Sequence, residues 1–138
     1  MSLTRAIPVV VADASAVVET IGGEPVWEER VRRWRSEGVM ILAPVNLRTE
    51  VANALLLGVG LDASDVIGRM RHVFEAGLDV ADRGLVGVFD AIELAARHGL
   101  TVYDAAYLAL ALEVDGELAT TDRALAAAAL AEGVSVLS

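Results

Sequence analysis

The stretch Ile7-Pro-Val-Val-Val-Ala12-Asp13 decides the fold that we expect for this chain. Its apolar residues follow one another without interruption and are rich in Val, which is typical of a strand buried on both faces of a parallel sheet. Asp13 ends the run, and a helical pattern follows at 14–21. Strand and helix patterns alternate along the rest of the chain. This alternation predicts an α/β fold, a three-layer α/β/α sandwich with a mainly parallel central sheet.

Glycine and proline mark the boundaries of the other elements. Gly22 and Gly23 end the first helix, Pro25 lies near the start of the second, and Gly99 is a C-terminal stop. There is no repeat or linker, so we expect one domain over residues 1–138. Further strands are expected at 39–43, 78–81, 117–120 and 134–137, and further helices at 26–37, 47–57, 62–76, 85–98, 101–113 and 122–131.

The composition excludes several classes of protein. Hydrophobic residues make up 55% of the chain, which is too many for a disordered protein. The apolar stretches are far shorter than the roughly 20 residues of a membrane-spanning helix, and no signal-peptide pattern follows Asp13. The absence of cysteine excludes disulfides and thiolate metal sites and fits a cytoplasmic protein. The sequence does not decide whether Met1-Ser-Leu3 is native.

The charge is unusual for a protein that binds nucleic acid. The net charge is −9, and all eleven cationic residues are arginines. Nucleic-acid binding normally shows as a basic surface. An acidic protein can still act on RNA where local arginines and a bound metal ion reverse the field around the site.

Two aspartates are expected at one edge of the sheet. Asp13 ends the first strand, and Asp122 directly follows the strand at 117–120. Ligands of open α/β sheets bind beyond the carboxyl ends of the strands. Both side chains therefore point to the same candidate site.

Two further acids lie in apolar helices. Asp104 is the only charge between His98 and Glu113, and Glu50 has a similar setting, with Asn53 on its helical face. A buried carboxylate is costly unless a cation or several hydrogen-bond donors compensate its charge. Each acid alone has a simpler interpretation as a helix cap or an ion-paired residue. Taken together, the four favour one shared metal site.

The ligand types indicate which metal would bind. No His or Cys lies beside the four acids, and oxygen ligands suit Mg²⁺ or Mn²⁺ better than Zn²⁺. Such ions can activate water and stabilise the leaving oxygen when a phosphodiester is displaced in line.

Four motifs together resemble those of the PIN-domain family. They are Val-Val-Val-Ala-Asp13-Ala-Ser15-Ala, Pro44-Val-Asn-Leu-Arg-Thr-Glu50-Val-Ala-Asn53-Ala-Leu, Tyr103-Asp104-Ala-Ala-Tyr107-Leu-Ala-Leu-Ala and Leu118-Ala-Thr120-Thr-Asp122-Arg-Ala-Leu. They occur in order and span nearly the whole chain. The short length without an added domain is similar to the toxin branch of the family called VapC.

The resemblance implies an activity and a set of roles. Asp13, Glu50, Asp104 and Asp122 would be the catalytic and metal-binding acids, and Thr120, Ser15 and Asn53 would support them. The implied activity is metal-dependent cleavage of RNA, leaving 3′-hydroxyl and 5′-phosphate ends, by the toxin of a toxin–antitoxin pair. The implied partners are the RNA substrate, a cognate antitoxin whose tail enters the acidic groove, and a second copy in a homodimer.

Several other features have two open interpretations. Arg30, Arg32, Arg33 and Arg35 surround Trp34, either as an RNA or antitoxin contact or as a solvated helix face. Trp27, Val31 and Trp34 form one helical stripe, for which core packing is favoured over an interface. Arg123 either contacts substrate phosphate or lies on the surface. We expect Tyr103 and Tyr107 in the core, and His72 and His98 in structural or surface positions.

Three other functions share features with this sequence. Phosphoacceptor receivers and haloacid-dehalogenase-type phosphatases also place acids around Mg²⁺, but those families use a lysine, which this chain lacks, and the phosphatases an Asp-x-Asp where this chain has Asp13-Ala-Ser15. The serious alternative is a PIN-fold protein that binds a partner protein or RNA without cutting it.

Overall fold

The computed structural model describes residues 8–138, and the predicted start of the first strand at Ile7 lies outside them. Five strands form one sheet in the order β3-β2-β1-β4-β5, and every neighbouring pair is parallel. The strands are β1 (Val9–Ala12), β2 (Met40–Pro44), β3 (Leu78–Ala81), β4 (Glu117–Ala119) and β5 (Val136–Leu137). The predicted parallel sheet is therefore confirmed.

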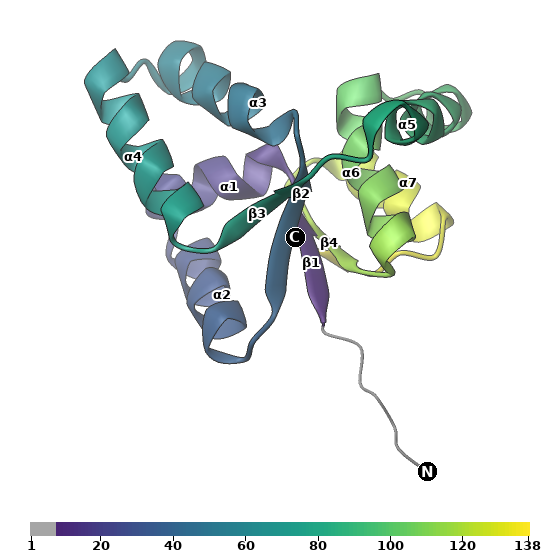
Figure 1. Cartoon of the computed structure of the whole chain (residues 1–138), viewed down its shortest axis with the longest axis horizontal. Coiled ribbons are helices and arrows are strands. Elements are labelled where there is room, and N and C mark those ends of the chain that lie inside the picture. Colours follow the sequence, from purple (N-terminus) through teal and green to yellow (C-terminus); the bar gives the residue numbers. More distant parts are fainter. Residues whose placement is uncertain (1–7) are drawn as a thin grey trace.

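Helices cover both faces of the sheet, as a three-layer sandwich requires (Figure 1). On one side lie α1 (Ala14–Ile21), α2 (Pro25–Ser36), α3 (Leu47–Asn53) with the π-helix η1 (Ala54–Val59), and α4 (Ala63–Glu75). On the other side lie α5 (Gly84–His98), α6 (Val102–Val114) and α7 (Arg123–Ala131). None of the helices in residues 8–138 is long and apolar enough to cross a membrane.

The core lies between the sheet and these two helical layers. Val11 and Leu118, on neighbouring strands, are fully buried, as the uninterrupted apolar run predicts. Trp27 and Trp34 are buried and Val31 packs against them, so core packing of the tryptophan stripe is confirmed. His98 is half-buried and lies 2.8 Å from Glu132, which confirms its structural position, and His72 is exposed.

The tyrosine pair divides between core and surface. Tyr107 is fully buried, as expected, whereas the prediction that Tyr103 lies in the core is wrong, because its side chain is 66% exposed. Tyr103 belongs to the first turn of α6, at the rim of a groove, while Tyr107 lies one turn further in. The apolar sequence of α6 alone does not distinguish these two environments.

Candidate active site

The strand order reverses beside β1, and this reversal creates the candidate site. The chain runs from β1 to β2 and β3 on one side, whereas β4 and β5 lie on the other. The connections after β1 and β4 therefore diverge, leaving a crevice at the carboxyl ends of these strands. Asp13 and Thr120 directly follow the paired residues Ala12 and Ala119, and the Asp13 N–H donates to the Ala119 carbonyl at 3.0 Å.

Asp13 is held by hydrogen bonds from both sides of this crevice. Its Oδ1 accepts from the Ser15 hydroxyl at 2.6 Å and from the Ala16 N–H at 2.9 Å, and its Oδ2 accepts from the Thr120 hydroxyl. The Ser15 hydroxyl in turn accepts the Thr121 N–H at 2.9 Å. These bonds tie the connection after β1 to the connection after β4 and fix the buried Asp13 carboxylate.

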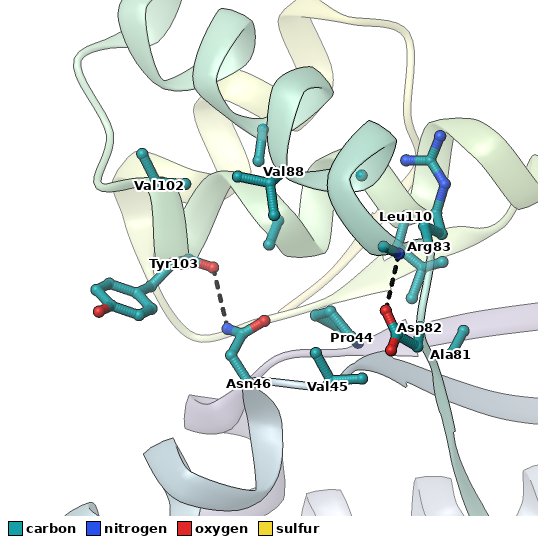
Figure 2. Close-up of a pocket in the computed structure, with 14 residues that line it drawn as sticks. Pro44, Val45, Asn46, Ala81, Asp82, Arg83, Val88, Val102, Tyr103 and Leu110 are labelled. Carbon is teal, nitrogen blue, oxygen red and sulfur yellow. Dashed lines mark hydrogen bonds between the residues drawn. The ribbon is translucent and has the colours of Figure 1, made fainter.

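Glu50 enters the site from the first turn of α3. The Tyr107 hydroxyl donates to its Oε2, and the Asn46 amide donates to its Oε1 at 3.2 Å. Asn46 also donates to the Tyr103 carbonyl at 3.4 Å, as Figure 2 shows. Glu50 is therefore held between α3 and α6, the two helices that approach the crevice from opposite faces of the sheet.

Asp104 and Asp122 lie at the starts of helices. The Asp104 N–H donates to the Thr101 hydroxyl, the N-cap of α6, at 3.1 Å. Asp122 is the N-cap of α7, and its Oδ1 accepts the N–H groups of Ala124 and Leu125 at 2.9 and 3.2 Å. Helix capping therefore accounts for the position of Asp122 without excluding a shared acidic site.

The carboxylates of the candidate site affect one another's pKa values. Burial raises the pKa of Asp13, and the negative charge of Asp122 raises it further, against the hydrogen bonds from Ser15 and Thr120. Burial likewise raises the pKa of Glu50, and the charges of Asp104 and Asp13 add to this effect. The pKa of Asp104 is raised first by burial and then by Asp122. Each acid thus acts on at least one other, as members of one site do.

The supporting residues differ in part from those predicted. Ser15 and Thr120 contact Asp13 directly. Asn53, in contrast, is exposed in a shallow groove against α4, and no hydrogen bond among the described residues joins it to Glu50. Asn46 takes this place. Its position four residues before Glu50, across one helical turn, is the signal in the sequence that could have identified it.

Tyr107 is a second site residue that was not predicted, because its sequence pattern indicated only a place in the core. Its ring is buried and its hydroxyl reaches Glu50. It follows Asp104 by three residues, so the two share a face of α6. A hydroxyl on that face of an otherwise apolar helix was the available signal, because a buried tyrosine O–H needs a partner.

The acids fit a hydrated divalent ion better than a closed metal cage. Among residues 8–138, no three His, Asp or Glu side chains are placed to hold a metal ion as they stand. Both oxygens of Asp13 and of Glu50 already accept hydrogen bonds. Mg²⁺, however, keeps several waters and needs only one or two carboxylates. Hard-oxygen donors from Asp13, Glu50, Asp104 and Asp122 match that requirement.

An apolar groove of about 530 Å³ adjoins the acids. Asn46 lies in its wall, and Val45 and Val88 line it between the connections after β2 and β3 and helices α5 and α6 (Figure 2). Asn46 therefore connects the wall of the groove to Glu50, to which its amide donates. Arg123, next to Asp122, is exposed at the start of α7.

Comparison with known proteins agrees with this geometry. The chain matches the PIN domain family over residues 10–131. It is 62% identical to Ribonuclease VapC3 of Pyrobaculum aerophilum over 37 residues, which span 27% of this chain and 28% of that relative. The chain therefore matches little more than a quarter of this curated relative's length.

Solved structures share the fold at low sequence identity. The Mycobacterium tuberculosis VapC20 structure, described as a sarcin-ricin loop cleaving toxin, has a TM-score of 0.68 and 13% identity, covering 86% of this chain and 94% of that one. VapBC2 of Rickettsia felis, bound to a DNA fragment from the promoter, has a TM-score of 0.65 and 14% identity, covering 83% and 87%. The family match over most of the chain, together with this fold, shows that the protein belongs to the PIN domain family.

Proposed function

We propose that this protein is a Mg²⁺- or Mn²⁺-dependent endoribonuclease that acts as the toxin of a toxin–antitoxin pair. One observation carries the proposal: Asp13 lies at the crevice where the strand order reverses, and Glu50, Asp104 and Asp122 come from three other segments and are near enough for the charges of these acids to affect one another's pKa values. Membership of the PIN family and the similarity to Ribonuclease VapC3 support cleavage of RNA.

The chain's own residues prepare the site for this chemistry. Ser15 and Thr120 fix the carboxylate of Asp13, while Tyr107 and Asn46 orient that of Glu50. The four acids would hold the metal, with waters completing its shell. The bound metal would polarise the scissile phosphate and lower the pKa of the attacking water. The products would be 3′-hydroxyl and 5′-phosphate ends.

The partners belong to the same proposal. Related folds are known as toxins and in VapBC complexes, which supports a cognate antitoxin as the regulator of this chain. The proposal also includes a cytoplasmic place of action, in keeping with a chain that has no cysteine. Its last part is a homodimer.

A nuclease assay separates cleavage from the alternative of a PIN-fold protein that binds without cutting. Wild type and Asp13→Asn are incubated with labelled RNA and Mg²⁺ or Mn²⁺, with Asp65→Asn, an exposed acid of α4, as the control. Asparagine keeps the size and the capping ability of Asp13 but not its charge. We expect cleavage to fall about 100-fold or more in Asp13→Asn, because metal catalysis contributes several kcal/mol.

The control and the metal dependence decide the outcome. Asp65→Asn should cut like wild type, and EDTA should stop cleavage by both. Equal cleavage by wild type and Asp13→Asn would show that the active site is assigned wrongly. RNA binding without any cleavage would favour the non-cleaving alternative.

A further inference from the structure

A second concave surface lies between α2 and α4, on the face of the sheet that α1 covers. Arg32 and Arg35 line it from α2, and Arg69 and His72 line it from α4. These four side chains define what we call the arginine groove. It encloses about 560 Å³, and apolar side chains such as Val31 and Val73 form part of its wall.

The arginine groove is positively charged, whereas the chain as a whole is negatively charged. Six of the eleven arginines of the sequence belong to α2 and α4, four to the former and two to the latter. Three of them line the groove, and Glu28 is the one acid among the lining residues. The lining therefore carries a formal charge of +2 with His72 neutral, on a chain whose net charge is −9. Such local inversion attracts anions.

The guanidinium groups keep donors free for a ligand. Arg69 donates from Nη1 to the Ile21 carbonyl at 3.3 Å, which leaves its other N–H groups available. Arg32 forms an exposed pair with Glu29, and exposed pairs of this kind are weak. No ion pair within residues 8–138 involves Arg35. Arg30, in contrast, is used elsewhere, stacked over Trp27 and donating to the Ser138 carbonyl.

The groove is separate from the carboxylate site. Thr20 and Ile21, at the C-terminal end of α1, line it, whereas Asp13 caps the N-terminal end of the same helix. Eight helical residues span about 12 Å at 1.5 Å per residue. A polynucleotide of more than a few nucleotides is long enough to contact both places.

We propose that the arginine groove binds the phosphate backbone of the RNA substrate, away from the bond that is cut. This inference rests on the proposed function. The carboxylates at the cleavage site repel RNA, so affinity has to come from elsewhere on an acidic protein. Guanidinium groups bind phosphates with paired, charge-assisted hydrogen bonds. RNA, as a densely charged chain of phosphates, is favoured over an acidic protein segment for that reason.

The test measures binding of a labelled RNA hairpin by fluorescence anisotropy in EDTA, so that no cleavage occurs, at several salt concentrations. The groove pair Arg35→Gln/Arg69→Gln is compared with the control pair Arg33→Gln/Arg71→Gln. Each pair removes one arginine from α2 and one from α4, but only the first pair lines the groove. A lysine version, Arg35→Lys/Arg69→Lys, keeps the charge, and thermal melts check that every variant folds.

We expect the groove pair to weaken binding about 10-fold at 0.1 M salt and to lower the slope of log Kd against log salt by about 1.5, since each phosphate contact contributes 0.7–0.9. The control pair should stay within about twofold of wild type, and the lysine version should recover part of the loss. In the cleavage assay the groove pair should raise KM with kcat nearly unchanged, because the groove does not touch the reacting atoms.

Each alternative outcome has a distinct meaning. Equal losses in the groove and control pairs would reduce the effect to net charge and overturn the inference, even if the protein cuts RNA. Polyglutamate that displaces the RNA from wild type as well as unlabelled RNA of equal charge does would assign the groove to an acidic protein segment instead. Specific loss of RNA binding in the groove pair of a protein that never cuts RNA would uphold the groove and refute the nuclease. A wild type that binds no RNA in EDTA would overturn the groove, and it would refute the nuclease as well if it cuts no RNA with Mg²⁺ or Mn²⁺.

Discussion

At the scale of single residues, two of the proposed metal-binding acids also serve the fold. Asp13 caps α1 and also accepts the hydroxyl hydrogen bonds that tie β1 to β4. Asp122 caps α7 in the same way. A capping interpretation and a metal-site interpretation of an aspartate at a helix start are therefore compatible, and the sequence alone could not choose between them.

Replacing Asp104 with Asn should stabilise the metal-free protein at pH 7. The pKa of Asp104 is raised above its ordinary 3.8, so folding favours its protonated form. Its contribution to stability is present below the unfolded pKa and is lost as pH rises through the folded pKa. Removing the charge should therefore help at pH 7 and make little difference near pH 3.5. Thermal melts in EDTA across this range measure the difference.

Asp65→Asn is the matched control for this variant. Asp65 holds the same third position after an N-cap, in α4, but it is exposed. Losing its favourable interaction with the helix dipole should cost about 0.3–1 kcal/mol at pH 7. If Asp104→Asn destabilises the protein as Asp65→Asn does, repulsion among the four acids does not lower the stability of the metal-free protein.

Tyr107→Phe should slow cleavage while leaving the fold intact. Phenylalanine fills the same buried volume but cannot donate to Glu50, and a hydrogen bond to a charged group contributes about 1.5–3 kcal/mol. A fall in kcat of about 10-fold or more is the expected result, measured by single-turnover cleavage of labelled RNA. Tyr103→Phe, at the exposed position one turn earlier, should cut like wild type. Equal kinetics of both variants would remove Tyr107 from the positioning of Glu50.

At the scale of elements, local sequence signals predicted where the helices and strands lie. They did not distinguish an α-helix from a π-helix. The expected helix at 47–57 is present but becomes the π-helix η1 from Ala54, and it extends to Val59. A run of leucines fits the apolar side of an α-helix and of a π-helix alike, so the sequence does not distinguish them. Gly60, with φ of +80°, ends this segment.

The two glycines at this helix end should respond oppositely to alanine. Gly60→Ala places a Cβ in a left-handed backbone conformation, which costs about 1–2 kcal/mol. Gly58→Ala lies inside η1 with open space around it, and should stabilise the protein by up to about 1 kcal/mol. Denaturant unfolding measures both free energies. A stabilised Gly60→Ala variant would show that the segment ends differently.

At the scale of the whole molecule, the order of the strands is what unites the site. The sequence placed Asp13 and Asp122 at strand ends, and parallel strands share one edge, so their convergence could be predicted. The helical spacing of Asn46, four residues before Glu50, was also available in the sequence. The hydrogen bond from Tyr107 to Glu50 could not be predicted, because it joins residues 57 positions apart and depends on how α6 packs across the sheet. Periodicity shows which face of a helix is buried, and only the fold shows what that face meets.

The distribution of charge, likewise, could be predicted from the sequence only in part. Composition showed an acidic chain with arginine as its sole cation, while the grouping of Arg35 with Arg69 across α2 and α4 depends on tertiary packing. The protein therefore separates an acidic crevice from an arginine groove. The arginines of α2 alone are compatible with both an RNA contact and a solvated face, because α4 contributes half of the side chains that define the groove.

The most direct test of the central claim is a crystal soaked with Mn²⁺ and measured at an energy where manganese scatters anomalously. We expect an anomalous peak in the crevice, contacting Asp13 directly or through one water and lying among Glu50, Asp104 and Asp122. The same soak of Asp13→Asn should lose or greatly weaken that peak. A peak found only away from the crevice, or one of equal strength in both proteins, would contradict the assignment of the four carboxylates to one metal-dependent site.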